Sequence, residues 1–254
     1  MRDHRRVIVV TMEPVLPTSS PVPPGKGVRV ARTLRALGHE VTVTGIGSGV
    51  TEPHPGPVRD WAGLLAVYRG LLARGAEGVA LCGGLPPGVP VGGYAELIRE
   101  ARAAGVYVAL DAYGPALRRG LGARPDLVVQ DAAGLAALTG FAEPVRAARD
   151  AYKRGARAVA APLGPGGAGM LALAEEGGWH AAPPRHARGL GATATDHALA
   201  GLLSGAVTGL PWPERLARAV ALTESPGPPP GGGYDPGRYA EVLSRVVVEP
   251  LATS

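Results

Sequence analysis

An aspartate and a histidine stand side by side at the start of a segment with helical periodicity, Asp196 to Val207. A carboxylate next to an imidazole can move protons to and from a bound molecule, so Asp196 and His197 are candidates for acid–base catalysis. Two structural alternatives stay open. Asp196 can be the carboxylate that caps the helix, and His197 can be a solvent-facing side chain of the first turn.

The single cysteine, Cys82, follows a predicted buried strand and precedes the Gly83-Gly84 turn. A thiol at the carboxyl end of a strand can act as a nucleophile. The alternative is a small, buried hydrophobic side chain. One cysteine excludes an internal disulfide and a metal site built from cysteines, and we assign no residue to a metal.

Strand and helix patterns alternate along the chain, which predicts βαβ units around a mainly parallel sheet. Ligands of such sheets bind at the carboxyl ends of the strands. We expect one domain over residues 1–254. The predicted strands are Arg6–Met12, Val41–Thr44, Gly78–Leu81, Val106–Leu110, Leu127–Val129 and Ala158–Ala161, with a hairpin at Gly169–Leu173 and Gly178–Ala182. The predicted helices are Gly25–Leu37, Trp61–Ala73, Tyr94–Ala104, Pro115–Leu121, Ala132–Leu138, Pro144–Arg154, Asp196–Val207, Pro213–Leu222 and Arg238–Val246.

The composition excludes several classes of protein. The 254 residues are 46% hydrophobic and 19% charged, which is typical of a globular chain and not of a disordered one. The net charge of +5 has no long basic run and no interleaved aromatics, so we expect no nucleic-acid partner. No apolar stretch reaches the roughly 18 residues of a membrane span. The charged start of the chain is unlike a signal peptide, and we predict a cytoplasmic protein.

Several stretches, in order along the chain, resemble the PfkB carbohydrate kinases, and most closely the branch that acts on fructose 1-phosphate and tagatose 6-phosphate. The resemblance implies a ribokinase-like, three-layer αβα sandwich with a mainly parallel central sheet. The stretches are TMEPVLP (11–17), PGKGVRVARTLRALGHEVTVTG (24–45), GGLPPGVP (83–90), ALDAYGPALRRGL (109–121), PDLVVQDAAGLAALTG (125–140) and LGATATDHALAGLL (190–203).

The resemblance implies roles for the residues at matching positions. Asp196 stands where the family has the base that takes a proton from a substrate hydroxyl. Thr193, Ala194 and Thr195 stand where backbone N–H groups at a helix start cradle the moving phosphoryl group. Further matching positions are Lys26 and Asp111 on the substrate side and Gly164 and Gly167 on the nucleotide side.

The same positions depart from the family pattern. The family motif Gly-Ala-Gly-Asp has become Thr193-Ala194-Thr195-Asp196, with β-branched residues in place of both glycines. Pro17 replaces an aspartate that grips sugar hydroxyls, Glu13 and Arg29 replace asparagines, and Val129 and Gly134 replace a lysine and a glutamate that serve the nucleotide and its Mg²⁺. These losses predict impaired phosphotransfer.

The replacements also introduce charges into the cleft. Lys26 and Arg29 can bind a phosphate or a carboxylate, and Glu13, Cys82 and Asp111 complete the predicted substrate-binding set. The structural alternatives are solvated charges at a helix start and a salt bridge between Glu13 and Arg29.

A β-rich lid of the family lies between the second strand and the next helix. Here the stretch from Gly45 to Gly49 runs almost directly into a proline-rich segment, so we predict that the lid sheet is absent. Its absence would admit water and weaken sugar binding. It also argues against the family's lid-mediated dimer, while another oligomer stays open.

Three functional hypotheses follow. The first is a repurposed family member that binds or transforms another small molecule in the same cleft. The second is an active kinase that phosphorylates a hydroxyl of a sugar phosphate or related molecule, with Asp196 as base. The third is a non-catalytic pseudokinase that acts through a partner protein. No cofactor is assigned, and ATP and Mg²⁺ are expected only if kinase activity survives.

Overall fold

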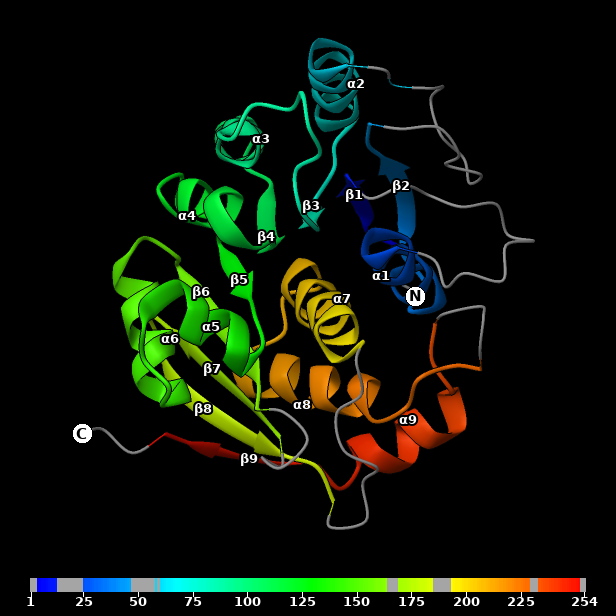
Figure 1. Ribbon diagram of the computed structural model, residues 1–254. Helices are drawn as coiled ribbons and strands as arrows, with labels where there is room; N and C mark the ends of the chain where they lie inside the picture. The colour runs from blue at the N-terminus through cyan, green and yellow to red at the C-terminus, as the bar shows by residue number, and fades with distance from the viewer. Residues whose placement is uncertain are drawn as a thin grey trace.

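The computed structural model describes residues 4–12, 25–46, 58, 60–163, 169–184, 193–228 and 233–251. A nine-stranded sheet with the order β2-β1-β3-β4-β5-β6-β7-β8-β9 runs through this part of the chain (Figure 1). The strands are β1 (Arg6–Thr11), β2 (Glu40–Thr44), β3 (Gly78–Cys82), β4 (Tyr107–Asp111), β5 (Leu127–Val129), β6 (Ala158–Pro162), β7 (Met170–Ala174), β8 (Gly177–Ala182) and β9 (Val247–Pro250).

Strands β1 to β6 pair in parallel, and β7, β8 and β9 extend the sheet in antiparallel pairs. The carboxyl ends of β1, β3 and β4 are aligned, because Thr11 pairs with Cys82 and Cys82 pairs with Asp111. The predicted α/β fold with a mainly parallel sheet is therefore confirmed. One edge of the sheet therefore gathers the strand ends that carry two of the predicted site residues, Cys82 and Asp111.

Helices cover both faces of the sheet (Figure 1). The side chains of α2 to α6 form one apolar core with the sheet, and those of α1, α7 and α8 form a second core on the opposite face. The helices are α1 (Lys26–Ala36), α2 (Trp61–Ala73), α3 (Gly93–Ala103), α4 (Gly114–Leu121), α5 (Ala132–Thr139), α6 (Pro144–Lys153), α7 (Ala194–Val207), α8 (Trp212–Thr223) and α9 (Pro236–Leu243).

Local sequence explains several of these elements. Every residue of β3 is buried, as expected for a central strand covered on both faces. Helices α2 and α5 begin at Asp60 and Asp131, whose side chains accept hydrogen bonds from the backbone three residues on. Helix α5 ends at Gly140, which adopts a left-handed conformation that glycine tolerates best.

The carboxyl-terminal end of the chain differs from the prediction. The expected helix over Arg238–Val246 ends at Leu243, and Val247–Pro250 forms β9 on the edge of β8. The run of valines from Val246 to Val248 favours a strand, and the free edge of β8 provides its partner. The predicted loss of the lid concerns residues 47–57 and 59, which lie outside the described residues.

Within the described ranges, none of the helices combines the length and the apolar character that a bilayer crossing requires.

Candidate active site

Two helix starts meet at the carboxyl ends of the parallel strands. Helices α1 and α7 pack against each other on one face of the sheet, and both contact β3 (Figure 1). Their first turns carry Lys26 and Arg29 on α1 and Asp196 on α7. Asp111, the last residue of β4, lies on the same face as these side chains. The fold thus brings together residues that are up to 170 positions apart in sequence.

These four charged residues form an ionic cluster. The Nζ of Lys26 lies 2.7 Å from Oδ2 of Asp111 and 3.1 Å from Oδ1 of Asp196. The Nε of Arg29 lies 2.5 Å from Oδ2 of Asp196. Lys26 also donates a hydrogen bond of 2.9 Å to Oγ1 of Thr195. Both oxygens of the candidate base are therefore engaged by cations.

The carboxylates of the cluster are more deeply buried than its cations. The side chains of Asp196 and Asp111 are 2% and 6% exposed, whereas those of Lys26 and Arg29 are 17% and 23% exposed. The carboxylates thus lie beneath the cations, and a molecule that approaches from solvent meets positive charge first. This arrangement favours an anionic ligand.

Burial and charge pairing shift the pKa values of the cluster. Burial raises the pKa of Asp111 to about 6, although the neighbouring Lys26 opposes this rise. Burial alone would lower the pKa of Lys26, but the carboxylates of Asp111 and Asp196 outweigh it and raise that pKa. Lys26 is therefore a permanent cation at neutral pH, and its positive charge persists at the mouth of the site.

Gln130 is a site residue that sequence reasoning missed. Its Nε2 donates to the carbonyl of Ala112 at 2.8 Å and lies 3.3 Å from Oδ1 of Asp111. A Cβ on Gly134 would lie 2.5 Å from Oε1 of Gln130, so the glycine leaves room for the amide. The available signal was its place between Val129 and Gly134, the two positions at which the nucleotide motif of the family is altered.

The structure gives Asp196 and His197 separate surroundings. Thr193 is the residue that caps α7, so Asp196 is not the helix cap, and its carboxylate binds the cluster instead. His197 is buried, which contradicts the solvent-facing alternative. Its Nδ1 lies 3.1 Å from the carbonyl oxygen of Thr193 and its Nε2 lies 3.0 Å from that of Gly233. The ring nitrogens thus face main-chain carbonyls, and the imidazole joins α7 to the chain near Gly233.

Some of the remaining predicted residues lie in the described part of the chain, and the others lie outside it. Ala194 begins α7 and is buried beside Thr193 and Thr195. Cys82 is fully buried in the core shared with α1 and α7, as the hydrophobic alternative expects. Three further predicted residues, Glu13, Gly164 and Gly167, lie outside the described residues, as does the predicted Glu13–Arg29 pair.

The described residues do not fit a magnesium site of the kind that the family resemblance implies. Asp111 and Asp196 are paired with cations, Asp131 caps α5, and glycine occupies position 134. Within the described ranges, no three His, Cys, Asp or Glu side chains gather as metal ligands. We therefore derive no step through a metal ion from these residues.

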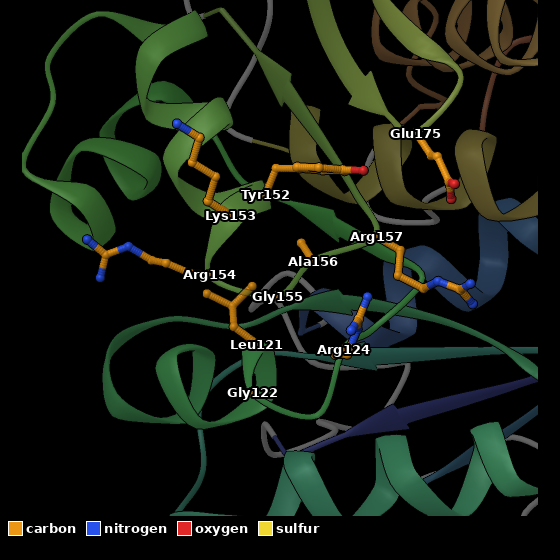
Figure 2. Close-up of a pocket in the computed structure, with 10 residues that line it drawn as sticks. All are labelled: Leu121, Gly122, Arg124, Tyr152, Lys153, Arg154, Gly155, Ala156, Arg157 and Glu175. Carbon is orange, nitrogen blue, oxygen red and sulfur yellow. The ribbon is translucent and has the colours of Figure 1, made fainter.

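A cavity of about 490 Å³ lies away from the ionic cluster, at the amino ends of β5 and β6 (Figure 2). Several of its basic side chains are near the carboxyl ends of α4 and α6, where positive charge complements the helix dipole. Arg154 pairs with Asp150 at 2.5 Å, and Arg157 pairs with Asp126 at 3.2 Å. None of the predicted site residues lines this cavity, which is distinct from the ionic cluster.

The fold and the position of the cluster define the class: an αβα protein of the ribokinase-like type with a site at the carboxyl ends of its strands. Two solved structures share this fold. The structure of phosphofructokinase-2 from Escherichia coli in complex with fructose-6-phosphate superposes with a TM-score of 0.74 at 21% sequence identity. The superposition covers 95% of this chain and 99% of the phosphofructokinase-2 chain. A carbohydrate kinase from Agrobacterium tumefaciens superposes with a TM-score of 0.69 at 16% identity and covers 97% of this chain and 100% of its own.

Sequence similarity then gives the family. No family model matches the chain. The 1-phosphofructokinase of Rhodobacter capsulatus is 36% identical in an alignment that covers 78% of this chain and 78% of that protein. The chain belongs to the PfkB family of carbohydrate kinases that includes 1-phosphofructokinase.

Proposed function

We propose that this chain is a PfkB-family protein in which ATP-dependent phosphotransfer is impaired and whose cleft binds or transforms another small molecule. The observation that carries the proposal is the state of Asp196. Its carboxylate is almost fully buried, with one oxygen held by Arg29 and the other by Lys26.

A general base needs a lone pair within reach of the substrate hydroxyl. Both carboxylate oxygens of Asp196 already contact cations, so a substrate hydroxyl has to displace one of them to approach a lone pair. The family pattern has a neutral asparagine at the position of Arg29, so the contact between Arg29 and Asp196 departs from that pattern. The arginine therefore opposes the proton transfer that the family mechanism requires.

The start of α7 supports the same proposal. Thr193 and Thr195 replace the two glycines of the family motif, and Thr195 Oγ1 accepts a hydrogen bond from Lys26. A side chain that binds Lys26 thus stands where the family motif has a glycine. The substitutions keep the backbone N–H groups, but β-branched residues adopt fewer backbone conformations than glycine, which restricts how these groups can point at a phosphoryl group.

A second candidate function is an active sugar-phosphate kinase. It is favoured by the 36% identity to the Rhodobacter 1-phosphofructokinase and by the aspartate kept at the base position. In this case Arg29 would have to leave Asp196 when substrate and ATP bind. The two functions predict opposite results in one assay.

The test measures ATP consumption with a panel of sugar phosphates, together with calorimetric binding of ATP and Mg²⁺. We expect no sugar-dependent turnover by the wild-type protein. Arg29→Asn, which restores the family residue, should raise turnover if the arginine is the main block. Arg32→Asn, three residues further along α1, is the matched control and should leave turnover unchanged. Sugar-dependent turnover by the wild type that Asp196→Asn abolishes would establish the active kinase instead.

A further inference from the structure

An apolar groove of about 380 Å³ opens at the carboxyl ends of the parallel strands, on the segments that follow β1, β3 and β4. The residues that define it here are Met12, Gly84, Leu85, Val91, Tyr113 and Pro115. Each stands one or more positions beyond the end of its strand, at the edge of the sheet where ligands of parallel sheets bind. None of the residues that line the groove belongs to the ionic cluster.

Two side chains of the groove are exposed to an extent that is unusual for their type. Tyr113 is 59% exposed and Val91 is 51% exposed. Among the described residues, the third large hydrophobic side chain of this kind is Val247 on β9, outside the groove. Exposed apolar side chains that gather in a hollow indicate a binding surface.

The tyrosine is held in place by its neighbour. A Cβ on Gly84 would lie 2.5 Å from the Tyr113 hydroxyl oxygen, so the ring rests on the backbone of the Gly83-Gly84 turn. Only a glycine allows this contact. The ring thus has a fixed support while more than half of the residue stays open to solvent, which is the arrangement of a stacking platform.

A short piece of chain connects the groove to the ionic cluster. Tyr113 stands two residues after Asp111, a distance of about 7 Å at most along the chain, and Asp111 binds Nζ of Lys26. Lys26 and Arg29 are the more exposed members of the cluster. The main-chain separation between the two parts is within the span of one small molecule.

We propose that this groove and the cations of Lys26 and Arg29 form one binding site for a small organic anion with an apolar, ring-shaped body. The proposal deepens the proposed function, on which it rests for the repurposed cleft. Sugars present hydroxyl groups, and the groove offers them Met12, Leu85, Val91 and Pro115 instead of polar partners. Its volume is in the range of small-molecule pockets, about 300–1,000 Å³.

Two probes that differ only by a ring test this site. Calorimetry compares 2-phenylethylphosphonate with ethylphosphonate on the full chain. We expect the ring-bearing phosphonate to bind at least about tenfold more tightly, because the ring buries apolar surface in the groove. Equal affinity of the two probes, or no binding of either, would overturn the proposal.

Matched variants locate the ring. Tyr113→Ser and Val91→Ala should each reduce the preference for the ring-bearing probe, while Tyr113→Phe should keep it. Val247→Ala removes an equally exposed valine outside the groove and should change nothing. All three positions are exposed, and thermal unfolding checks that each of the four variants is folded. A preference that survives Tyr113→Ser and Val91→Ala would place the ring elsewhere and overturn the proposal.

Two further outcomes separate this inference from the proposed function. Sugar-dependent ATP consumption would refute the proposed function, whereas the phosphonate comparison would still decide the groove. A second copy of the chain could also cover these apolar residues. If sedimentation shows a dimer that Val91→Asp dissociates, the groove is a subunit interface and the small-molecule proposal is wrong.

Discussion

Asp111 is a carboxyl group buried beside a lysine, and its protonation is linked to folding. Its pKa in the folded protein is about 6, against an ordinary value of 3.8, because burial disfavours the charged form. The folded state therefore holds this proton more tightly than the unfolded state does. It follows that Asp111 lowers the free energy of unfolding as the pH rises from about 4 to 6, with no further change above that range.

Asp111→Asn should remove this pH dependence. Urea unfolding of the wild type and the variant at several pH values from 4 to 7 isolates the contribution, because other carboxyl groups cancel in the difference. We expect the stability of the wild type to fall relative to the variant by about 2 kcal/mol across this range. Lys26 stays charged throughout, so loss of its partner adds only a constant. A difference that does not vary with pH would mean that Asp111 is ionised as readily as in the unfolded chain.

Helix α1 approaches β1 so closely that one of its residues has to be glycine. A Cβ on Gly27 would lie 2.3 Å from Cβ of Thr11 and 2.7 Å from its Oγ1. The family resemblance placed Lys26, the residue before Gly27, on the substrate side of the cleft. The structure gives Gly27 a packing role in addition, because it sets the depth at which α1 presents Lys26 and Arg29 to the cluster.

Gly27→Ala should therefore destabilise the protein by about 1–3 kcal/mol, the usual cost of overpacking. Gly70→Ala is the matched control, because Gly70 lies in α2 with nothing within 4 Å of an added Cβ. That change should stabilise the protein by about 0.5–1 kcal/mol through helix propensity. Chemical denaturation measures both. Equal effects of the two substitutions would show that α1 can shift away from β1 without loss.

At the scale of the whole molecule, the sequence predicted more of the fold than of the site. The α/β order follows from buried valine-rich strands alternating with amphipathic helices, and each of these is a local pattern. The strand β9 was missed because its pairing depends on the free edge of β8, which is distant in sequence. The convergence of Lys26, Arg29 and Asp196 could be expected only in part. The family resemblance gave their positions in the cleft, but not that Arg29 pairs with the candidate base.

The ion pair between Arg29 and Asp196 links the first helix to the seventh, and a control pair in the same chain shows what burial adds. Arg154 and Asp150 meet with the same atoms at the same 2.5 Å, but they lie one turn apart on α6 and their side chains are 45% and 28% exposed. Asp196 is 2% exposed. Exposed pairs of this kind contribute about 0.3–0.5 kcal/mol, because solvent screens them and ordering the side chains costs entropy.

Double-mutant cycles on the two pairs should therefore give different coupling energies. For Arg29→Gln with Asp196→Asn we expect a coupling of about 1–3 kcal/mol in unfolding free energy, because each single substitution leaves a poorly solvated partner behind. For Arg154→Gln with Asp150→Asn we expect no more than about 0.5 kcal/mol. The coupling between α1 and α7 should also persist at high salt, where that of the α6 pair fades. Equal and salt-sensitive couplings would mean that the cluster is open to water, and Asp196 would then be free to act as a base.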